Sequence, residues 1–597
     1  MKLTCSDNIG KSYCPIALGN GDLSLLVDYT GGTRPQKYGK VTTGIWRAGL
    51  RYDKPDTPLV PFGFFEHRVD GAGRIVRWNQ TFHVTAAASE SLCVYENGSS
   101  VHSYIYCHLL HNLVVIRKEL YGAESLHMVF AFQPARTMLA PLSVTRTAYC
   151  IDTGSGVGGT LAFFSPDDIS ADRNGSEITL SAGKSAVFYL AFDEEAETYA
   201  RFHSESELEE SHRTAWTEYW AESTVPAANL PEKVLQAART SEYHLRISST
   251  AWSIPTGIYP THWQGRYFAF DEFFALEGLL AAGHGSIARK IPDFRLTHLE
   301  AAKRRAYEYF GEKSAAARFV WEAIEIPGIE GAPCGFWLDH IFHMAHIGLG
   351  AWHCQQQIKE PEYLRNTAYP LLRACAEFFR LFAITEKDKG HFIIGKCTDL
   401  ERLGAAQENA YMTTCGAIAL FRAAVEAAEI LDVDSGLRTD WTRLAAALTD
   451  SLPQDEHSYL PYPGCADKSI ALFSGLYPYN CLSSNDPKQR RAIEEFCATE
   501  NRFGNMYPVG GSLCTWYAGW KALTFHRLGK QEAAEDIVRQ MANETGGFSE
   551  VYEVGEIGTN PWFTTAEGIL LQAVCEIFGT YRPENVEKKV NKTRQCE

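Results

Sequence analysis

An acidic loop in front of a long helix is the first place where this sequence could carry out chemistry. The run GKCTDLERLGAAQENAYMT, residues 395–413, sets Glu401 between two glycines, and apolar residues then recur at helical spacing. A carboxyl group held at the mouth of a helical scaffold suits bond cleavage by proton donation. The alternative is that Asp399, Glu401 and Glu408 only favour the first turn of the helix through its dipole.

Two aromatic positions could bind a flat, hydroxyl-rich molecule. Trp263, Gln264 and Arg266 precede a long apolar helix in a proline-flanked loop, so the indole could form a stacking platform. Arg266 could then bond to hydroxyl groups or hold a carboxylate. Trp562 stands just before the last helix, where it could form the floor of a pocket. Packing in the core is the alternative for both tryptophans.

A third cluster stands just before another helix and consists of Trp337, Asp339 and His340. We expect these residues to bind the substrate. His343 and His346 continue it at every third position, a spacing that resembles a metal-binding motif. No acid or Cys completes a ligand set, so we expect no metal, and such histidines more often hydrogen-bond to a ligand or to neighbours. The sequence has no GxSxG, P-loop or dinucleotide-binding motif, and no cofactor is expected.

The first third of the chain has the pattern of β-strands. Runs such as RIVRWNQTFHV, SLCVYENGSS and NLVVIRKEL alternate apolar and polar residues and are separated by turn residues. No long helical pattern interrupts them. The sequence therefore predicts an antiparallel β-sandwich over residues 1–204.

Helical patterns dominate the rest of the chain. Residues 205–228 are predicted to form a helical linker, and residues 229–582 contain about eleven helices that come in pairs. Helical hairpins that are alternately Ala-rich and charged favour a closed (α/α)6 barrel. An open α-solenoid is the alternative, and the absence of a repeat of fixed length argues against it. The tail, residues 583–597, is polar and is expected to fray.

The composition narrows the possible partners and location. The 597 residues carry a net charge of −16, which disfavours nucleic acid because polyanions need a basic surface. The 16 cysteines are scattered without CxxC pairs, which suggests reduced thiols in the cytoplasm. No signal peptide or membrane-spanning stretch is evident, so no membrane partner is expected. The composition leaves a homodimer open.

Four segments carry a resemblance to the clan of inverting glycoside hydrolases and phosphorylases that place a β-sandwich before an (α/α)6 barrel. The nearest is family 65, with kinship to families 15, 63 and 95. The segments are LGNGDLSLLVDYTGG, WQGRYFAFDEFFALEGLL, GFWLDHIFHMAHIGLGAWH and CTDLERLGAAQENAYMT. In the last of these, the family pattern places the general acid ten residues before the Tyr of an Asn-Ala-Tyr triplet, which implies Glu401.

The same resemblance implies further site residues. Asp271 aligns with a residue that grips sugar hydroxyls beside the scissile bond, and its neighbour Glu272 is the acid of the same motif. Three features depart from family 65. The residues that flank Glu401 differ, the paired-Lys loop of the phosphorylases is missing, and no C-terminal β-domain follows the barrel. These departures leave the substrate in question.

An inverting hydrolase needs a second carboxylate that activates water on the far face of the sugar. Glu550 follows Gly546 and Gly547 in a region that resembles the Gly-Gly-x-Glu base loop of trehalases, and Glu567 in the last helix is the rival. The alternative is that such acids are solvated or cap helices. The acid should lie against aromatic residues with a raised pKa, and the base should be nearer to solvent and polar donors.

The resemblance thus implies an inverting glycosidase that acts on an oligosaccharide. The expected substrate is an α-glucoside. A phosphorylase is the first alternative, in which inorganic phosphate replaces the water. A polysaccharide lyase or sugar epimerase on the same toroid is the second, and a non-catalytic sugar-binding scaffold is the third. Release of a sugar 1-phosphate, or of an unsaturated product, would distinguish the enzymatic alternatives.

Overall fold

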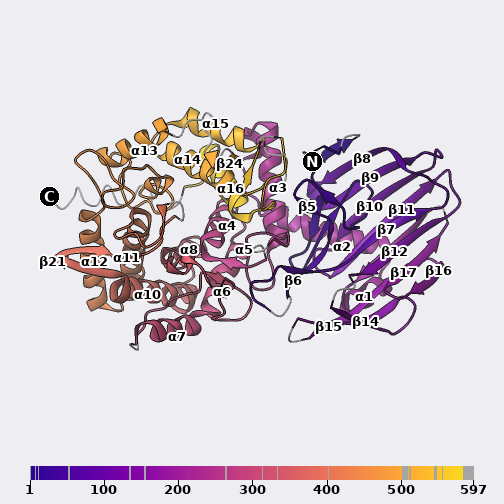
Figure 1. The fold of residues 1–597 in the computed structure, drawn as a ribbon, viewed down its shortest axis with the longest axis horizontal. Coiled ribbons are helices and arrows are strands. Elements are labelled where there is room, and N and C mark those ends of the chain that lie inside the picture. The colour runs from indigo at the N-terminus through magenta and orange to yellow at the C-terminus, as the bar shows by residue number, and fades with distance from the viewer. Residues whose placement is uncertain are drawn as a thin grey trace.

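The structure is a computed structural model, which describes residues 9–582 with several gaps (Figure 1). The gaps are residues 11, 52–53, 134–135, 154–155, 184, 262–264, 312–313, 333, 401–402, 500–507, 510–511, 544–547 and 554. Only the backbone is described for residues 2–6, 336–337 and 508–509. Glu401, Trp263, Gln264, the Trp337 side chain and the tail 583–597 therefore lie outside the described residues.

Two antiparallel sheets form the N-terminal domain, which lies on the right of Figure 1. The larger sheet, as far as it is described, has the order β1 (Lys2–Ser6), β8 (Ile75–His83), β9 (Ala88–Tyr95), β10 (Ser100–Cys107), β11 (Leu113–Tyr121), β18 (Ser185–Ala191), β15 (Val157–Phe164), β14 (Arg146–Ile151), β13 (Thr137–Pro141). The other has the order β16 (Ser170–Asn174), β17 (Glu177–Ala182), β12 (Leu126–Phe132), β7 (Leu59–Val69), β6 (Gly44–Arg51), β3 (Leu23–Val27), β2 (Ile16–Gly19). A small hairpin, β4 (Lys37–Tyr38) and β5 (Val41–Thr42), and the turn η1 (Val84–Ala86) complete the domain.

Alternating side chains explain how these strands form a sandwich. In β10, buried and partly exposed residues alternate from Ser100 to Tyr104, as expected for a strand with one face in the core. The aromatic residues of the two sheets meet between them: Phe130 of β12 lies 6.1 Å from Phe163 of β15, measured between ring centroids. The apolar face of each sheet is thus buried against the other.

Two helices follow the last sandwich strand. These are α1 (Glu194–Phe202) and α2 (Glu205–Ala221), and Ser204 begins α2 with a capping box that it forms with Glu207. Trp216 and Tyr219 of α2 are buried in the sandwich core. The helix therefore packs onto the sheets through its aromatic residues.

The helical domain is a ring of inner helices surrounded by outer ones. The inner elements are α4 (Ala269–Ala281), α8 (His343–Ile358), α11 (Tyr411–Leu431), the short η7 (Ile470–Phe473), α14 (Thr515–Arg527) and α16 (Thr564–Ile577). The outer helices are α3 (Glu232–Ser248), α6 (Lys290–Thr297), α7 (Leu299–Phe310), α10 (Tyr369–Phe378), α12 (Ser435–Asp450), α13 (Pro487–Thr499) and α15 (Gln531–Met541). Short connections are η2 (Ala227–Asn229), α5 (Gly285–Ala288), η3 (Phe336–Asp339), α9 (Pro361–Tyr363), η4 (Leu364–Ala368) and η5 (Phe379–Ala383).

Sequence explains which helices are inside. Every residue of α4 and of α16 is buried, as expected of helices surrounded on all sides by protein. These two helices close the ring where Gly278 meets Gly568. A Cβ on Gly278 would lie 2.3 Å from the Gly568 carbonyl oxygen, so the backbones approach too closely for any side chain. The fold confirms the predicted β-sandwich followed by an (α/α)6 barrel.

Short strand pairs fix the loops at one end of the barrel. They are β19 (Tyr267–Phe268) with β20 (Glu322–Ala323), β21 (Ile384–Asp388) with β22 (His391–Ile394), and β23 (Pro508–Val509), β24 (Ser512–Cys514) and β25 (Val551–Tyr552) in one small sheet. Cys514 pairs with Val551, which places Glu550 beside the start of α14. Within the described ranges, none of the helices combines the length and apolar character that crossing a membrane would require.

Candidate active site

The first turns of the inner helices lie at one end of the barrel and carry the predicted acids. Asp271 is in the first turn of α4, Glu567 is in the first turn of α16, and Glu550 leads into β25 beside α14. Because the inner helices of the ring all begin at this end, residues far apart in sequence come together here. This end is the candidate active site.

Asp271 is a buried carboxyl group that faces two other site residues. Its side-chain oxygen Oδ1 accepts a short hydrogen bond from the Thr565 hydroxyl of α16, and only 4% of the residue is exposed. Burial raises the pKa of Asp271 well above its usual range, and the nearby charge of Glu550 raises the pKa further. The structure therefore brings Asp271, Glu550 and Thr565 into one group.

Glu550 is held by backbone bonds on both sides and oriented by one side chain. Its N–H donates to the carbonyl oxygen of Thr559 at 3.1 Å, and its own carbonyl accepts from the Thr515 N–H at 3.1 Å. Asn560 Nδ2 donates to the Oε2 atom of Glu550 at 2.7 Å. Glu550 is partly exposed. A polar donor and access to solvent are the surroundings expected of a base.

The loop that carries Glu401 is described on both sides of that residue. Asp399 is fully buried and lies against the first turn of α11, where its carboxylate accepts from the Thr413 N–H at 3.0 Å and from the Thr413 hydroxyl at 2.6 Å. Burial raises the pKa of Asp399 to about 6. Asp399 therefore accepts hydrogen bonds from the N-terminal backbone of α11. This is the alternative role, favouring the first turn of the helix, that the sequence analysis gave for the acids of this loop.

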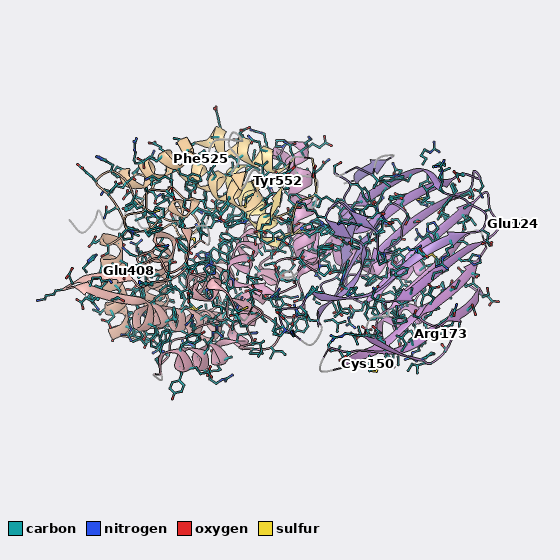
Figure 2. The ribbon with its side chains drawn as sticks, viewed as in Figure 1. Glu124, Cys150, Arg173, Glu408, Phe525 and Tyr552 are labelled. Atoms are coloured by element: carbon teal, nitrogen blue, oxygen red, sulfur yellow. The ribbon has the colours of Figure 1, made fainter. Side chains whose placement is uncertain are left out.

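The other acid of that loop, Glu408, lies away from the group around Asp271. Lys387 of β21 forms an ion pair with it at 2.6 Å, on the hairpin of β21 and β22. Figure 2 shows Glu408 beside this hairpin and well separated from Tyr552, which is two residues after Glu550. Glu408 is thus a partly exposed surface acid.

Glu567, the rival for the base, is completely buried. His244 of α3 contacts it through Nδ1 at 2.5 Å from Oε1. Burial lowers the pKa of His244 to about 3, so the imidazole is neutral at neutral pH. Glu567 is therefore engaged with an outer helix.

Two predicted binding residues form ion pairs outside this group. Glu272 accepts from Arg295 Nε at 2.7 Å and from the Ser253 hydroxyl at 2.5 Å, and it is 1% exposed. Arg266 holds the carboxylate of Glu322 at 2.6 Å, which is one of the two roles that the sequence suggested for it. Both side chains fasten the loops around α4 to their neighbours.

The three histidines contact different partners, and no ligand set forms. The His340 ring is buried against the backbone of Asp399 and lies 4.2 Å from the Trp321 ring, whereas the neighbouring Asp339 is exposed. His343 bonds to the Phe319 carbonyl oxygen at 3.2 Å, and His346 bonds to the Tyr479 hydroxyl at 3.0 Å. Across the described ranges no cluster of three or more His, Cys, Asp or Glu could hold a metal ion.

His340 and Asp339 bear on the acid loop. The Asp339 carbonyl oxygen accepts from the Thr398 N–H at 3.3 Å, and residue 340 pairs with residue 398 in a parallel bridge. The segment before α8 is thereby fastened to the chain just ahead of Glu401. These contacts connect the third and the fourth segments of the family resemblance.

Trp562 is a core residue between the two domains. It is 1% exposed, belongs to the sandwich core together with Ile258 and Ile557, and lies 5.8 Å from the Tyr259 ring. This is the packing alternative that the sequence analysis gave for this residue.

Three site residues carried no signal in the sequence analysis: Asn560, Thr565 and His244. Asn560 precedes a proline and has a φ of +49°, a conformation that Asn adopts more readily than most residues. Thr565 stands two residues before Glu567 in a TTAEG run. His244 lies 323 positions from its partner, so only the fold could reveal the pair.

Comparison with known proteins shows what the chain is similar to. Residues 337–565 match the glycosyl hydrolase family 95 catalytic domain, one of the families to which the sequence pointed. A solved structure assigned as a kojibiose phosphorylase from human microbiome aligns with a TM-score of 0.67 and 11% identity. The alignment covers 97% of this chain and 88% of that protein. A bacterial glucoamylase in complex with acarbose aligns with a TM-score of 0.61 and 12% identity. The alignment covers 96% of this chain and 95% of that protein. The chain therefore has the fold of these (α/α)6-barrel enzymes, and residues 337–565 are similar to a glycosyl hydrolase family 95 catalytic domain.

Curated relatives add two named enzymes. A kojibiose hydrolase of Mucilaginibacter mallensis is 25% identical over 398 residues, which are 64% of this chain and 55% of that protein. A kojibiose hydrolase of Flavobacterium johnsoniae is 25% identical over 399 residues, which are 64% of this chain and 54% of that protein. The chain thus spans about half the length of the curated relatives it matches.

Proposed function

We propose that the protein is an inverting glycoside hydrolase that cleaves an α-glucosidic bond in an oligosaccharide. The observation that carries the proposal is the Glu550 carboxylate, which Asn560 orients at the end of the barrel beside the buried Asp271. The relatives named kojibiose hydrolase support an α-linked glucose disaccharide as the first substrate to test.

The proposed reaction uses two carboxyl groups on opposite faces of the sugar. Glu401 gives its proton to the glycosidic oxygen as the bond to the anomeric carbon breaks. Glu550 takes a proton from a water molecule, whose oxygen attacks that carbon from the other face and inverts its configuration. This mechanism requires the two carboxyl groups to be roughly 6.5–9.5 Å apart.

Glu550 is proposed as the base in preference to Glu567. A base must stay ionised and must reach water, and Glu550 is partly exposed with an amide donor on its carboxylate. Glu567 is fully buried against His244. We assign to Glu567 the role of holding α16 to α3.

Asp271 is proposed to bind hydroxyl groups of the sugar beside the scissile bond. Its burial and its bond to Thr565 fix the position of the carboxyl group, which is what a directional bond to a hydroxyl requires. His340 and Asp339 are proposed to position the acid loop through their contacts with Thr398 and Asp399. Trp263, Gln264 and Trp337 remain predicted binding residues.

The test is hydrolysis of kojibiose followed by NMR of the released anomers. We expect β-glucose as the first product from the cleaved unit, loss of at least about a hundredfold in kcat in Glu401→Gln and Glu550→Gln, and wild-type activity in Glu553→Gln. Glu553 is an exposed acid three residues from Glu550, so it is a matched control. Retention of configuration, or activity in Glu550→Gln equal to that of Glu553→Gln, would exclude this mechanism.

The same assay with inorganic phosphate tests the phosphorylase alternative. If phosphate replaced water, glucose 1-phosphate would form only with phosphate present, and Glu550→Gln would keep its activity. We expect turnover without phosphate.

Location and assembly are the remaining proposals. We propose a cytoplasmic protein, supported by scattered cysteines that form no disulfide among the residues described. The chain could also form a homodimer. Light scattering of the purified chain distinguishes a homodimer from a monomer.

A further inference from the structure

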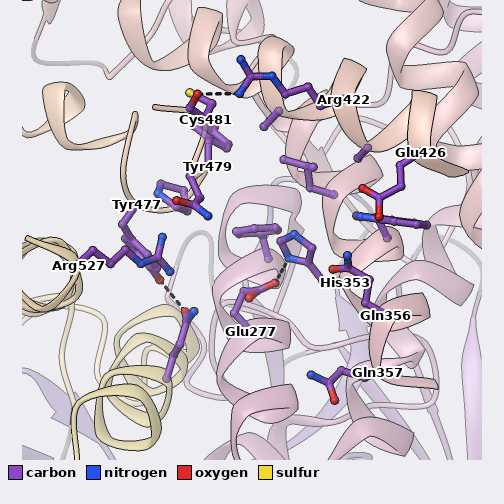
Figure 3. A pocket seen from close by; sticks show the side chains of 18 of the residues that line it. Glu277, His353, Gln356, Gln357, Arg422, Glu426, Tyr477, Tyr479, Cys481 and Arg527 are labelled. Carbon is purple, nitrogen blue, oxygen red and sulfur yellow. Dashed lines mark hydrogen bonds and ion pairs between the residues drawn. The ribbon is translucent and has the colours of Figure 1, made fainter. Parts of the chain in front are cut away.

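A cavity lined by both polar and apolar side chains lies at the opposite end of the barrel from the candidate active site. Its walls come from the later turns of the inner helices, including Glu277 of α4, Trp352 of α8 and Gln572 of α16, and from the segment after η7 (Figure 3). Asp271 and Glu277 lie on the same helix, but in the first and third turns. The cavity is therefore distinct from the site that holds Asp271 and Glu550.

Aromatic rings separate the two ends. The Phe273 ring stacks on His346 with 4.7 Å between centroids, and His346 stacks in turn on Tyr479 at 5.5 Å. Phe274 lies 5.7 Å from Trp520 in the same layer. Phe273 and Tyr479 also line the cavity, so this layer forms its inner wall.

The size of the cavity suits one small molecule. Its volume is about 80 Å³, which holds roughly five to eight waters at about 10–15 Å³ each. That is the space of one sugar ring with its hydroxyl groups, and it is too small for a disaccharide. Gln357 at its edge is exposed and Glu277 is buried, so the cavity runs inward from the surface.

Two acids, Glu277 and Glu426, and two arginines, Arg422 and Arg527, line the cavity, so its lining charges balance. Glu277 is bonded to His353 Nδ1 at 2.5 Å, and Arg527 lies 3.5 Å from the Glu576 carboxylate. Arg422 and Glu426, both on α11, add one charge of each sign. An anion would meet Glu277 and Glu426, and a cation would meet two arginines. The field therefore favours a ligand without net charge.

The remaining lining groups are those that recognise hydroxyl groups. Gln356 and Gln357 carry amides, which can donate and accept. The Gln572 amide is bonded within the protein, to the Tyr477 hydroxyl and to Glu576, each at 2.8 Å. The indole N–H of Trp352 is buried and has no acceptor among the residues that the structure describes. A buried donor without an acceptor is costly, and a ligand oxygen would satisfy it.

We propose that this far-end cavity is a second, non-catalytic binding site for one neutral sugar ring. The combination of an aromatic wall, planar amides and balanced charges identifies the ligand class. The proposal does not depend on which carboxylates cleave the substrate, because none of them lines this cavity.

The test combines a crystal soak with calorimetric titration of the full chain, with D-glucose as the probe. We expect hexose density between Glu277 and Gln356, and a class of binding sites that weakens about tenfold in Trp352→Phe and in Gln356→Ala. Their kcat on kojibiose should match that of wild type. Glu550→Gln should keep the far-end site, which separates it from the catalytic one.

Three results would overturn the proposal. The first is a soaked cavity that contains water only. The second is a titration in which both variants bind glucose like wild type. The third is inorganic phosphate bound in the cavity in place of glucose, which would show that the ligand is an anion. Circular dichroism of both variants excludes misfolding as the cause of weaker binding, and Gln356 is partly exposed, so its replacement should leave the fold intact.

Discussion

Asn560→Gly should move the acidic limb of the pH–rate profile upward by about one pH unit. Asn560 Nδ2 is the amide that bonds to the Glu550 carboxylate, at 2.7 Å. Glycine removes the amide and also tolerates the φ of +49° at this position. The substitution therefore tests the hydrogen bond without straining the backbone.

The magnitude follows from the charge and exposure of Glu550. A hydrogen bond to a charged group contributes about 1.5–3 kcal/mol, and a partly exposed carboxylate belongs at the lower end of that range. About 1.4 kcal/mol corresponds to one pH unit in the ionisation of the group. Asn560→Asp should shift the limb further, because a second carboxylate would face the first.

The assay is kcat/KM for kojibiose measured across the acidic and neutral range, since its acidic limb reports the ionisation of the base in the free enzyme. Lys359→Gly is a matched control: Lys359 has a φ of +56° and ends α8, at the opposite end of that helix from the site. An unchanged acidic limb in both Asn560 variants would refute the role of Glu550 as the base. An equal shift in Lys359→Gly would assign the effect to glycine itself.

Three further predictions concern stability, measured by urea denaturation. Arg295→Met should lower the free energy of unfolding by about 3–5 kcal/mol, because it leaves the buried Glu272 carboxylate uncompensated, and adding Glu272→Gln should recover part of the loss. Gly568→Ala should cost about 1–3 kcal/mol, since its Cβ would lie 2.2 Å from the Phe274 carbonyl oxygen, whereas Gly436→Ala, with nothing within 4 Å, should be nearly neutral. Burial lowers the pKa of Lys118 from 10.5 to about 7, so between these values the unfolded chain binds more protons and the free energy of unfolding should rise with pH. Lys118→Met should remove that rise, and an identical pH dependence in the variant would contradict the assignment.

The types of secondary structure in each domain could be predicted because strands and helices have periodic patterns of apolar residues. The alternation in β10 and the helical spacing in α11 are visible in short windows of sequence. The closed ring needed more than periodicity. It depends on the contact between Gly278 and Gly568, 290 positions apart in a chain whose local pattern also suits an open solenoid.

For the candidate site, the sequence could point only to residues whose signal lies within one segment. Asp271 and Glu550 stand in motifs that a short run of residues defines. Thr565 and Asn560 act through partners that the fold supplies, and Thr565 is 294 positions from Asp271. Glu272 stands in the same motif as Asp271, and the fold pairs it with Arg295 in a buried ion pair that the motif does not reveal. The far-end cavity had no motif, because each of its walls is an ordinary helical turn.

The closure of the ring by α16 also bears on when the protein can fold as it is made. The glycine face of α4 finds its partner only after residue 568 has left the ribosome, some 300 residues after α4 itself. The sheets of the first domain can form long before that, yet their core still awaits Ile557 and Trp562. Nascent chains that end before residue 557 should therefore expose apolar surface on both domains at once and depend on chaperones until synthesis is nearly complete.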